Sequence, residues 1–352
     1  MATKILASVL AISLRFPIGL PIKSNSLSLI LSYDSIMRPP YEITTTILKL
    51  ISQISEKLGS ASANYLDVPS PRLRKQNKIK TIHSSLSIEG NTLTEEHITA
   101  LIEHKRVMGP KKDIDEVLNA ISIYEELDRY TPNSLKSFLK AHKTLMRGLV
   151  DGAGSFRTQG VGIVKGTQVK HVAPPYENVP GLMNNLFTYL QYTDELCLIK
   201  SCVFHYEMEF IHPFLDGNGR MGRLWQTLIL KEEYPLFEFL PFETLIHQTQ
   251  IKYYQALARS DNAGSSTIFI EYMLAVINES LIDFISNTNP TMTDVERLDY
   301  FIHQKTGSFS RKEYMNVFKA ISSATASRDL KKGITLGYFK KQGEKNKTIY
   351  VI

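Results

Sequence analysis

The sequence is poor in cysteine and has no run that marks a membrane span. Cys197 and Cys202 are the two cysteines among 352 residues, and no Cys/His spacing typical of a zinc site accompanies them. Because they lie five residues apart in one predicted helix, a disulfide is not expected, which favours a reducing, cytoplasmic location. The mostly apolar run from Ile5 to Leu14 has ten residues, too few to cross a bilayer, so no membrane partner is expected.

Internal repeats and low-complexity tracts are also absent from the sequence. A hydrophobic content of 43% and a charged content of 22% are typical of a globular protein that buries a sizeable core. The length predicts two or three domains. Residues 294–352 hold twelve Lys or Arg against six Asp or Glu, so this segment carries the whole net charge of +6.

One run of twelve residues, from His212 to Arg223 (HPFLDGNGRMGR), concentrates the groups that a phosphate site needs. Gly217, Asn218 and Gly219 tolerate positive φ, and successive N–H groups in such a turn can bind an anion. Apolar residues recur after the turn, so a helix is expected to begin near Asn218 or Gly219. The N-terminal N–H groups of that helix would add to the anion site.

Charged side chains complete this run. Arg220 and Arg223 share a helix face and suit a di- or triphosphate, while Asp216 offers the hard oxygen that Mg²⁺ prefers. His212 titrates near neutrality and can accept a proton from a hydroxyl. Each feature alone is more often a turn, a solvated arginine pair or a structural histidine. Their joint occurrence at eight positions, H-x-F-x-D-G-N-G-R-x-x-R, indicates a phosphate-handling site.

This pattern is the signature of the Fic family, which the chain resembles from about Pro39 to about Ile285. Phe204 to Ile211 resembles the family's helix before the motif, with Met208 where Phe is usual. The resemblance also covers the two ends of a β-hairpin flap and a segment that closes over the nucleobase. These stretches are Gly154 to Thr158, Val172 to Pro175, and Tyr253, Tyr254 and Leu257.

The resemblance implies a protein adenylyltransferase that moves AMP from ATP to a Ser, Thr or Tyr hydroxyl of a protein. His212 would deprotonate the hydroxyl, and Asp216 would hold Mg²⁺ between the α- and β-phosphates. The amides of Gly217, Asn218 and Gly219 would form the anion hole. Arg220 and Arg223 would neutralise the β- and γ-phosphates, in keeping with catalysis by positioning and charge.

The resemblance also implies how the target and the base are held. The flap residues Val169, Lys170, His171 and Val172 would pair with an extended target segment, as in strand addition. Tyr253 is the candidate nucleobase contact, and a core aromatic on a helix is an equally open interpretation.

A second motif, Ser85 to Asn91 (SLSIEGN), lies far upstream. Ser85 and Glu89 share one helix face, and Gly90 stands where the helix is expected to end. The pattern matches the family's inhibitory sequence S/T-x-x-x-E-G/N. This match implies that Glu89 forms a salt bridge with Arg223, so that ATP binds in an unproductive pose. Taken alone, the pattern also fits a helix end with a surface glutamate.

The expected fold is mainly α: a Fic-type helical bundle with a small β-hairpin flap. Residues 1–36 form an extension without a clear small-residue cleavage site, which favours Met37 as the natural start over a targeting segment. Residues 37–133 are expected to form the N-terminal helical region with the inhibitory motif, and 134–286 the catalytic core. Helical patterns cover 43–58, stopped by Gly59, then 94–102, 113–130, 134–149, 180–192, 195–210, 244–260 and 268–284.

Residues 291–352 follow a polar linker and form a separate segment. Three short helical patterns, 295–305, 311–318 and 322–332, precede two short apolar stretches around Tyr338 and Tyr350. Three helices and a hairpin with a basic tip predict a winged helix-turn-helix with 322–332 as its recognition helix. The positive charge suits phosphate contacts, but winged helices also bind proteins, so DNA and a protein are both candidate partners.

Three functional hypotheses follow. The first is an adenylyltransferase using ATP and Mg²⁺, held in check by Glu89 and able to modify itself. The second is a DNA-binding regulator whose Fic core senses a nucleotide. The third is a Fic enzyme that uses another nucleotide, transfers phosphocholine or removes AMP. The intact pair Arg220 and Arg223 favours a triphosphate donor. Many Fic proteins dimerise, so a homodimer is a further expectation of the resemblance.

Overall fold

The computed structural model describes residues 38–63, 69, 71–165, 168–288, 293–318, 321–343 and 348–352. The expectations for residues 1–36 and for most of the turn at 343–347 lie outside these ranges. Within them the chain is mainly helical, as the amphipathic patterns predict. None of the described helices combines the length and the apolarity that a bilayer crossing requires.

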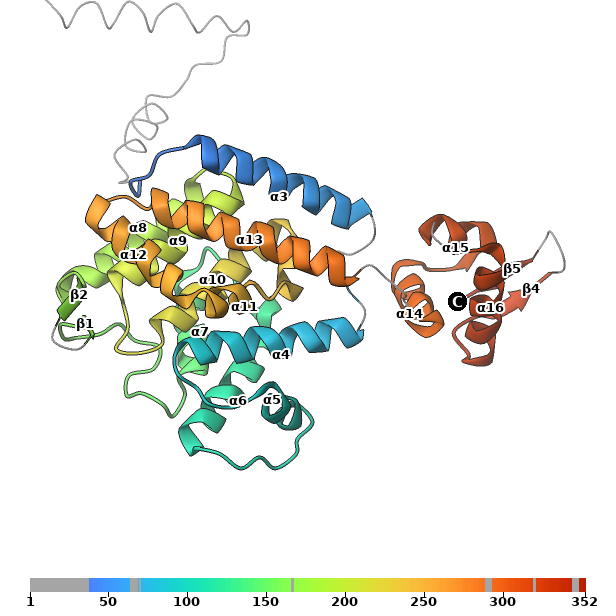
Figure 1. The fold of residues 1–352 in the computed structure, drawn as a ribbon. Coiled ribbons are helices and arrows are strands. Elements are labelled where there is room, and N and C mark those ends of the chain that lie inside the picture. Colours follow the sequence, from blue (N-terminus) through green and yellow to red (C-terminus); the bar gives the residue numbers. More distant parts are fainter. Residues whose placement is uncertain are drawn as a thin grey trace, which may run out of the picture. The chain divides into compact units, whose positions relative to one another are not determined.

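Eleven α-helices are described between residues 38 and 288 (Figure 1). They are α3 Thr45–Ala63, α4 Pro71–Ile88, α5 Glu95–Ile102, α6 Lys111–Glu125, α7 Leu135–Leu145, α8 Val179–Tyr192, α9 Cys197–Ile211, α10 Asn218–Glu233, α11 Phe242–Gln248, α12 Gln250–Ala263 and α13 Thr267–Thr288. Short 3-10 turns lie at Leu127–Arg129, Tyr176–Asn178 and Pro235–Phe239. Helices α9 and α10 pack together at the centre, α3 lies along α13, and α4 lies along α11.

An aromatic cluster ties the central helices to the predicted active-site run. Phe138 of α7 contacts Trp225 of α10 edge to face at 5.0 Å and stacks on Phe214 at 5.4 Å. Both phenylalanines and the tryptophan are fully buried. The indole Nε1 donates to the carbonyl of Pro132 at 2.7 Å. Because aromatic pairs stabilise beyond their buried area, this cluster fixes the loop that carries Phe214 onto the core.

Several helix ends differ from the prediction. Helix α6 ends at Glu125 and α7 at Leu145, before the predicted ends at 130 and 149. Gly59 lies inside α3, which continues to Ala63, because the flanking Leu58 and Ala61 are buried and their packing outweighs the low helix propensity of glycine. The pattern at 244–260 is not one helix but two, broken at Thr249. The Thr249 hydroxyl donates to the carbonyl of Leu245 at 2.6 Å, and such side-chain bonds compete with the helical ladder.

The predicted flap is a two-stranded hairpin. Strand β1 (Gly162–Lys165) pairs antiparallel with β2 (Gln168–Val172), with Gly162 opposite Val172 and a register shift between Ile163 and Val164. The expected side-chain contacts of Val169, Lys170, His171 and Val172 lie outside what the structure describes.

The C-terminal segment has its own hydrophobic cluster. Its elements are α14 Asp294–Gln304, β3 Ser308–Phe309, α15 Arg311–Val317, α16 Ser323–Thr335, β4 Lys340–Gln342 and β5 Ile349–Val351, and the strands pair in the order β3-β5-β4. Strand β3 was not predicted. Phe309 and Tyr350 stack at 5.3 Å, and Phe339 packs so close to Gly333 of α16 that a side chain there would collide with its ring. Three helices and a small sheet are therefore built around one aromatic core.

Candidate active site

The predicted phosphate-binding run forms a tight turn between α9 and α10. His212 ends α9 with φ 49°, in the left-handed region, and Gly217 has φ 87° just before α10 begins. Helix α10 begins at Asn218, as predicted. A Cβ at Gly217 would lie 2.7 Å from the sulfur of buried Met146, so both the conformation and the space require glycine here.

The side chain of Asn218 closes this turn. Its Oδ1 accepts from the amide of Phe214 and its Nδ2 donates to the carbonyl of Phe214, both at 2.9 Å. Asn218 is 2% exposed and Phe214 is fully buried. Because both polar ends of the amide are used, the turn is held by its own residues as well as by the aromatic core.

Asp216 lies on the open side of the turn. Its Oδ1 accepts from the amide of Gly217 at 2.6 Å and from Nη2 of Arg220 at 2.9 Å. The side chain is 45% exposed, and no described residue bonds its Oδ2. A half-exposed carboxylate oxygen without a protein partner is the kind of donor that Mg²⁺ takes alongside water and phosphate oxygens, so Asp216 fits the predicted metal ligand.

Both arginines of the run are buried and paired with carboxylates. Arg220 is 4% exposed and lies between Asp216 and Glu116 of α6, whose Oε1 is 3.0 Å from its Nη1. The other oxygen of Glu116 accepts from the side-chain amide of Asn91 at 2.8 Å. Glu116 was not predicted as a site residue. It links Arg220 to the end of the inhibitory motif.

Arg223 meets the inhibitory motif directly. It is fully buried, and its Nη2 donates to Glu89 Oε1 at 2.7 Å and to the carbonyl of Ser85 at 2.9 Å. Its Nε donates to the hydroxyl of Ser85 at 3.1 Å. Burial alone lowers the pKa of Arg223, but the carboxylate of Glu89 outweighs it and holds the pKa above its ordinary value. The salt bridge expected between Glu89 and Arg223 is therefore present.

Glu89 also lies against the start of α10. A Cβ at Gly219 would collide with its carboxylate. Helix α4 ends just before it: Gly90 has φ 91°, and the amide of Asn91 returns to the carbonyl of Leu86 at 3.1 Å. The carboxylate of Glu89 thus lies beside the N-terminus of α10, where the sequence predicts an anion.

Comparisons with known proteins identify the family of this chain. The Fic/DOC family model matches residues 132–230. A crystal structure of a Fic family protein from Desulfovibrio desulfuricans G20 is 39% identical and covers 90% of this chain and 98% of that one, with a TM-score of 0.70. The chain belongs to the Fic family.

More distant relatives carry the name protein adenylyltransferase Fic. The one from Nematostella vectensis is 26% identical over 262 residues, and the one from Drosophila willistoni is 29% identical over 223 residues. These matches cover 57% and 42% of the relatives, so the chain spans about half their length. Fic-1 from C. elegans shares the fold at 18% identity and a TM-score of 0.55.

Tyr253 of this Fic protein is a core residue, which is the second of the two interpretations that the sequence left open. It is 1% exposed, and its hydroxyl is 3.0 Å from Nε2 of His205, so neither ring face is open to a base. The next residue, Tyr254, is 48% exposed. Adjacent residues on a helix point in different directions, and the sequence alone could not tell which tyrosine faces inward.

Three further buried polar residues of this Fic protein escaped the sequence analysis. His142, Arg157 and Glu243 are 1%, 3% and 0% exposed. Burial lowers the pKa of His142 to about 4 and raises that of Glu243 to about 8. No spacing pattern distinguishes His142 and Glu243 from other helical residues, and Arg157 was noted only as part of the flap.

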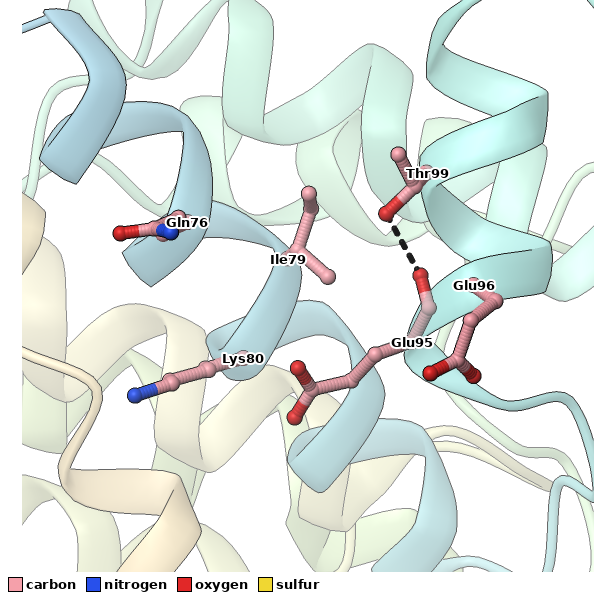
Figure 2. A pocket seen from close by; sticks show the side chains of 6 residues that line it. All are labelled: Gln76, Ile79, Lys80, Glu95, Glu96 and Thr99. Carbon is pink, nitrogen blue, oxygen red and sulfur yellow. Dashed lines mark hydrogen bonds between the residues drawn. The ribbon is translucent and has the colours of Figure 1, made fainter.

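A separate cavity of about 300 Å³ lies between α4 and α5 (Figure 2). Its lining residues are Gln76, Ile79, Lys80, Glu95, Glu96 and Thr99. None of the predicted site residues is among them, so this cavity is separate from the predicted nucleotide site.

Proposed function

We propose that this Fic protein transfers AMP from ATP to a hydroxyl group of a protein, with pyrophosphate as the second product. The observation that carries the proposal is that His212 and Asp216 lie in the turn before α10 and Arg220 and Arg223 in its first two turns, with Arg220 bonded to Asp216 at 2.9 Å. The names of the distant relatives, protein adenylyltransferase, support the same reaction.

In this reaction His212 takes the proton of the acceptor hydroxyl, whose oxygen forms a bond to the α-phosphorus. The bond between that phosphorus and the oxygen bridging to the β-phosphate breaks, and pyrophosphate leaves. Arg220 and the amides at the start of α10 stabilise the phosphate charge. Asp216 would hold Mg²⁺, which supplies further positive charge to the phosphates when bound.

We also propose that Glu89 inhibits the reaction. Arg223 cannot serve the γ-phosphate while its Nη2 donates to Glu89 at 2.7 Å. The carboxylate beside Gly219 also repels an incoming phosphate. Both effects favour an unproductive pose of ATP until Glu89 moves away.

The acceptor is proposed to dock on the flap. Strand addition to a two-stranded hairpin reads backbone more than sequence, which allows many acceptors, including a second copy of the chain in a homodimer. Self-modification would then be the first activity to appear in an assay.

Two buried, unpaired cysteines suit the predicted cytoplasmic location.

The test is label transfer from α-labelled ATP with Mg²⁺. The wild type, Glu89→Gly, and Glu89→Gly combined with His212→Ala are compared at matched ATP. We expect strong self-labelling by the first variant and none after the additional loss of His212. Equal labelling of the wild type and Glu89→Gly would exclude inhibition by Glu89. No transfer by any of the three proteins would exclude adenylylation, and other nucleotide donors would then be tested.

A second candidate function, DNA binding by residues 291–352, is supported by how the charges of this segment are paired. Three carboxylates, Asp294, Glu313 and Asp329, pair with Lys332, Lys305 and Arg297 at 2.7–2.9 Å. Six exposed cations on α15, α16 and β4 have no carboxylate partner among the described residues. They are Arg311, Lys312, Arg328, Lys331, Lys340 and Lys341.

If α16 lies in the major groove of DNA as a recognition helix, its exposed cations can contact the phosphates on either side of that groove. Fluorescence anisotropy with a labelled duplex tests this. The double variant Arg328→Glu, Lys331→Glu is compared with the charge-matched double control Lys49→Glu, Lys136→Glu, whose two exposed lysines lie outside residues 291–352. We expect weaker binding by the double variant and a shallower dependence on salt. Equal affinities would remove DNA as the partner.

A further inference from the structure

Two buried side chains, His142 and Arg157, bond the backbone of the site at two different carbonyls, those of Asp216 and His212. We propose that they are positioning residues for its two halves: His142 for the nucleotide half through Asp216, and Arg157 for the acceptor half through His212 and the flap. This inference rests on the proposed transfer of AMP.

His142 of α7 is held in one tautomer by its two hydrogen bonds. Its Nδ1 accepts from the amide of Gly154 at 2.8 Å and so carries no proton, which leaves Nε2–H to donate to the carbonyl of Asp216 at 3.0 Å. The imidazole lies flat on the ring of Phe214, with centroids 3.5 Å apart and planes 3° apart. The backbone carbonyl of Asp216 is thus held by His142, while the side chain of Asp216 stays 45% exposed.

Among the described residues, the guanidinium of Arg157 donates its hydrogen bonds to backbone carbonyls. Its Nε donates to the carbonyl of His212 at 2.8 Å, Nη1 to that of Gln159 at 3.0 Å, and Nη2 to that of Pro174. Its own amide donates to the carbonyl of Pro213 at 2.9 Å. Gln159 and Pro174 lie on either side of the hairpin, so one guanidinium joins the start and the end of the flap to the carbonyl of His212.

The two sets of bonds share no acceptor, so their effects should separate. Only a planar fork with several fixed donors reaches three carbonyls at once, which an ammonium on a flexible stem does not reproduce. Arg157→Lys therefore keeps the charge but loses the arrangement. His142→Gln keeps one donor and one acceptor and about the same length, but loses the flat ring on Phe214.

In the Glu89→Gly background, Arg157→Lys is expected to raise KM for the protein acceptor and lower kcat, together on the order of 10-fold to 100-fold in kcat/KM. The Kd of a non-transferable ATP analogue with Mg²⁺ should not change. His142→Gln is expected to raise that Kd and the Mg²⁺ concentration needed for half-maximal rate, on the order of 10-fold, with the acceptor KM unchanged. Arg129→Lys and His303→Gln are the exposed, matched controls.

Titration calorimetry with α,β-methylene-ATP and Mg²⁺, and hydrogen exchange of the β1 and β2 amides, complete the experiment. Neither needs transfer, so they test the two residues even where label transfer fails and the proposed function falls. We expect faster flap exchange in Arg157→Lys alone and weaker analogue binding in His142→Gln alone. Variants that change both readouts together with a lower Tm, or change neither, would overturn the assignment.

Discussion

At the scale of single residues, the site includes a glycine at which an added side chain would contact a buried neighbour. Gly217 has φ 87° and faces Met146, whereas Gly264 has φ 59° and meets nothing within 4 Å. A side chain at either position would be strained by the left-handed conformation, but only a side chain at Gly217 would also collide with a neighbour. This pair separates backbone strain from steric clash.

Gly264→Ala is expected to lower the free energy of unfolding by about 1 kcal/mol, from strain alone. Gly217→Ala should lower it by about 2–4 kcal/mol, because Met146 is fully buried and cannot move aside easily. Chemical denaturation measures both values. Equal losses in the two variants would show that the contact with Met146 is unimportant.

Glu243 gives a prediction about pH. Burial raises its pKa to about 8, so the folded chain holds this carboxyl neutral where the unfolded chain ionises it near 4.5. Stability from this group is therefore present at low pH and is lost as pH rises from about 4.5 through 8. Glu243→Gln should flatten the decline of Tm between pH 6 and pH 9 in thermal scans. The exposed control Glu125→Gln should not, and identical slopes in all three proteins would contradict the assignment.

At the scale of elements, helix α4, which carries the proposed inhibitory motif, is docked by buried polar side chains as well as by apolar ones such as Ile82 and Leu86. Asn77 donates to the carbonyl of Phe239 at 2.8 Å, and Ser84 is 3.2 Å from the hydroxyl of Thr244. Gln250, at the start of α12, donates to the carbonyl of Ile88 at 2.8 Å, one residue before Glu89. Because each such bond contributes little net free energy, the helix end can be released without unfolding the core.

Gln250→Ala should therefore weaken the inhibition by Glu89 without changing any residue from His212 to Arg223. Loss of one net hydrogen bond, about 1 kcal/mol, corresponds to about fivefold more released Glu89 and a similar rise in self-labelling. The rise should stay below that of Glu89→Gly. The exposed neighbour Gln248→Ala is the control, and labelling equal to the wild type would mean that Gln250 does not hold the helix end.

At the scale of the whole molecule, the described residues form two hydrophobic clusters with no member in common. One draws on residues from Ile47 to Phe284 and the other on residues from Leu298 to Tyr350. The entire site, including Glu89, Arg223 and the flap, belongs to the first range. Separate cores usually unfold as separate units.

A chain ending at residue 288 is therefore expected to fold, to keep the pairing of Glu89 with Arg223, and to respond to Glu89→Gly as the full chain does. Differential scanning calorimetry should show two transitions for the full chain and one for the shortened one. Equal self-labelling with and without Glu89→Gly in the shortened chain would show that residues 291–352 are needed to hold α4 in its inhibitory position.

Much of the site could be predicted because its parts are close in sequence. The start of α10 at Asn218 and the end of α4 before Gly90 follow from turn residues and helical periodicity. The break at Thr249 and the continuation of α3 past Gly59 did not follow, because packing and a side-chain bond override propensity there.

By itself the sequence determined the local features of the proposed site: a turn suited to binding anions, two arginines on one helix face, and a glutamate at the end of another helix. These are local properties, set by residues within a few positions of one another. Only the tertiary structure decided that Glu116 pairs with Arg220, that His142 and Arg157 bond the catalytic backbone, and that Tyr253 rather than Tyr254 is buried. Such contacts join distant segments and depend on how whole helices pack, which no short spacing encodes.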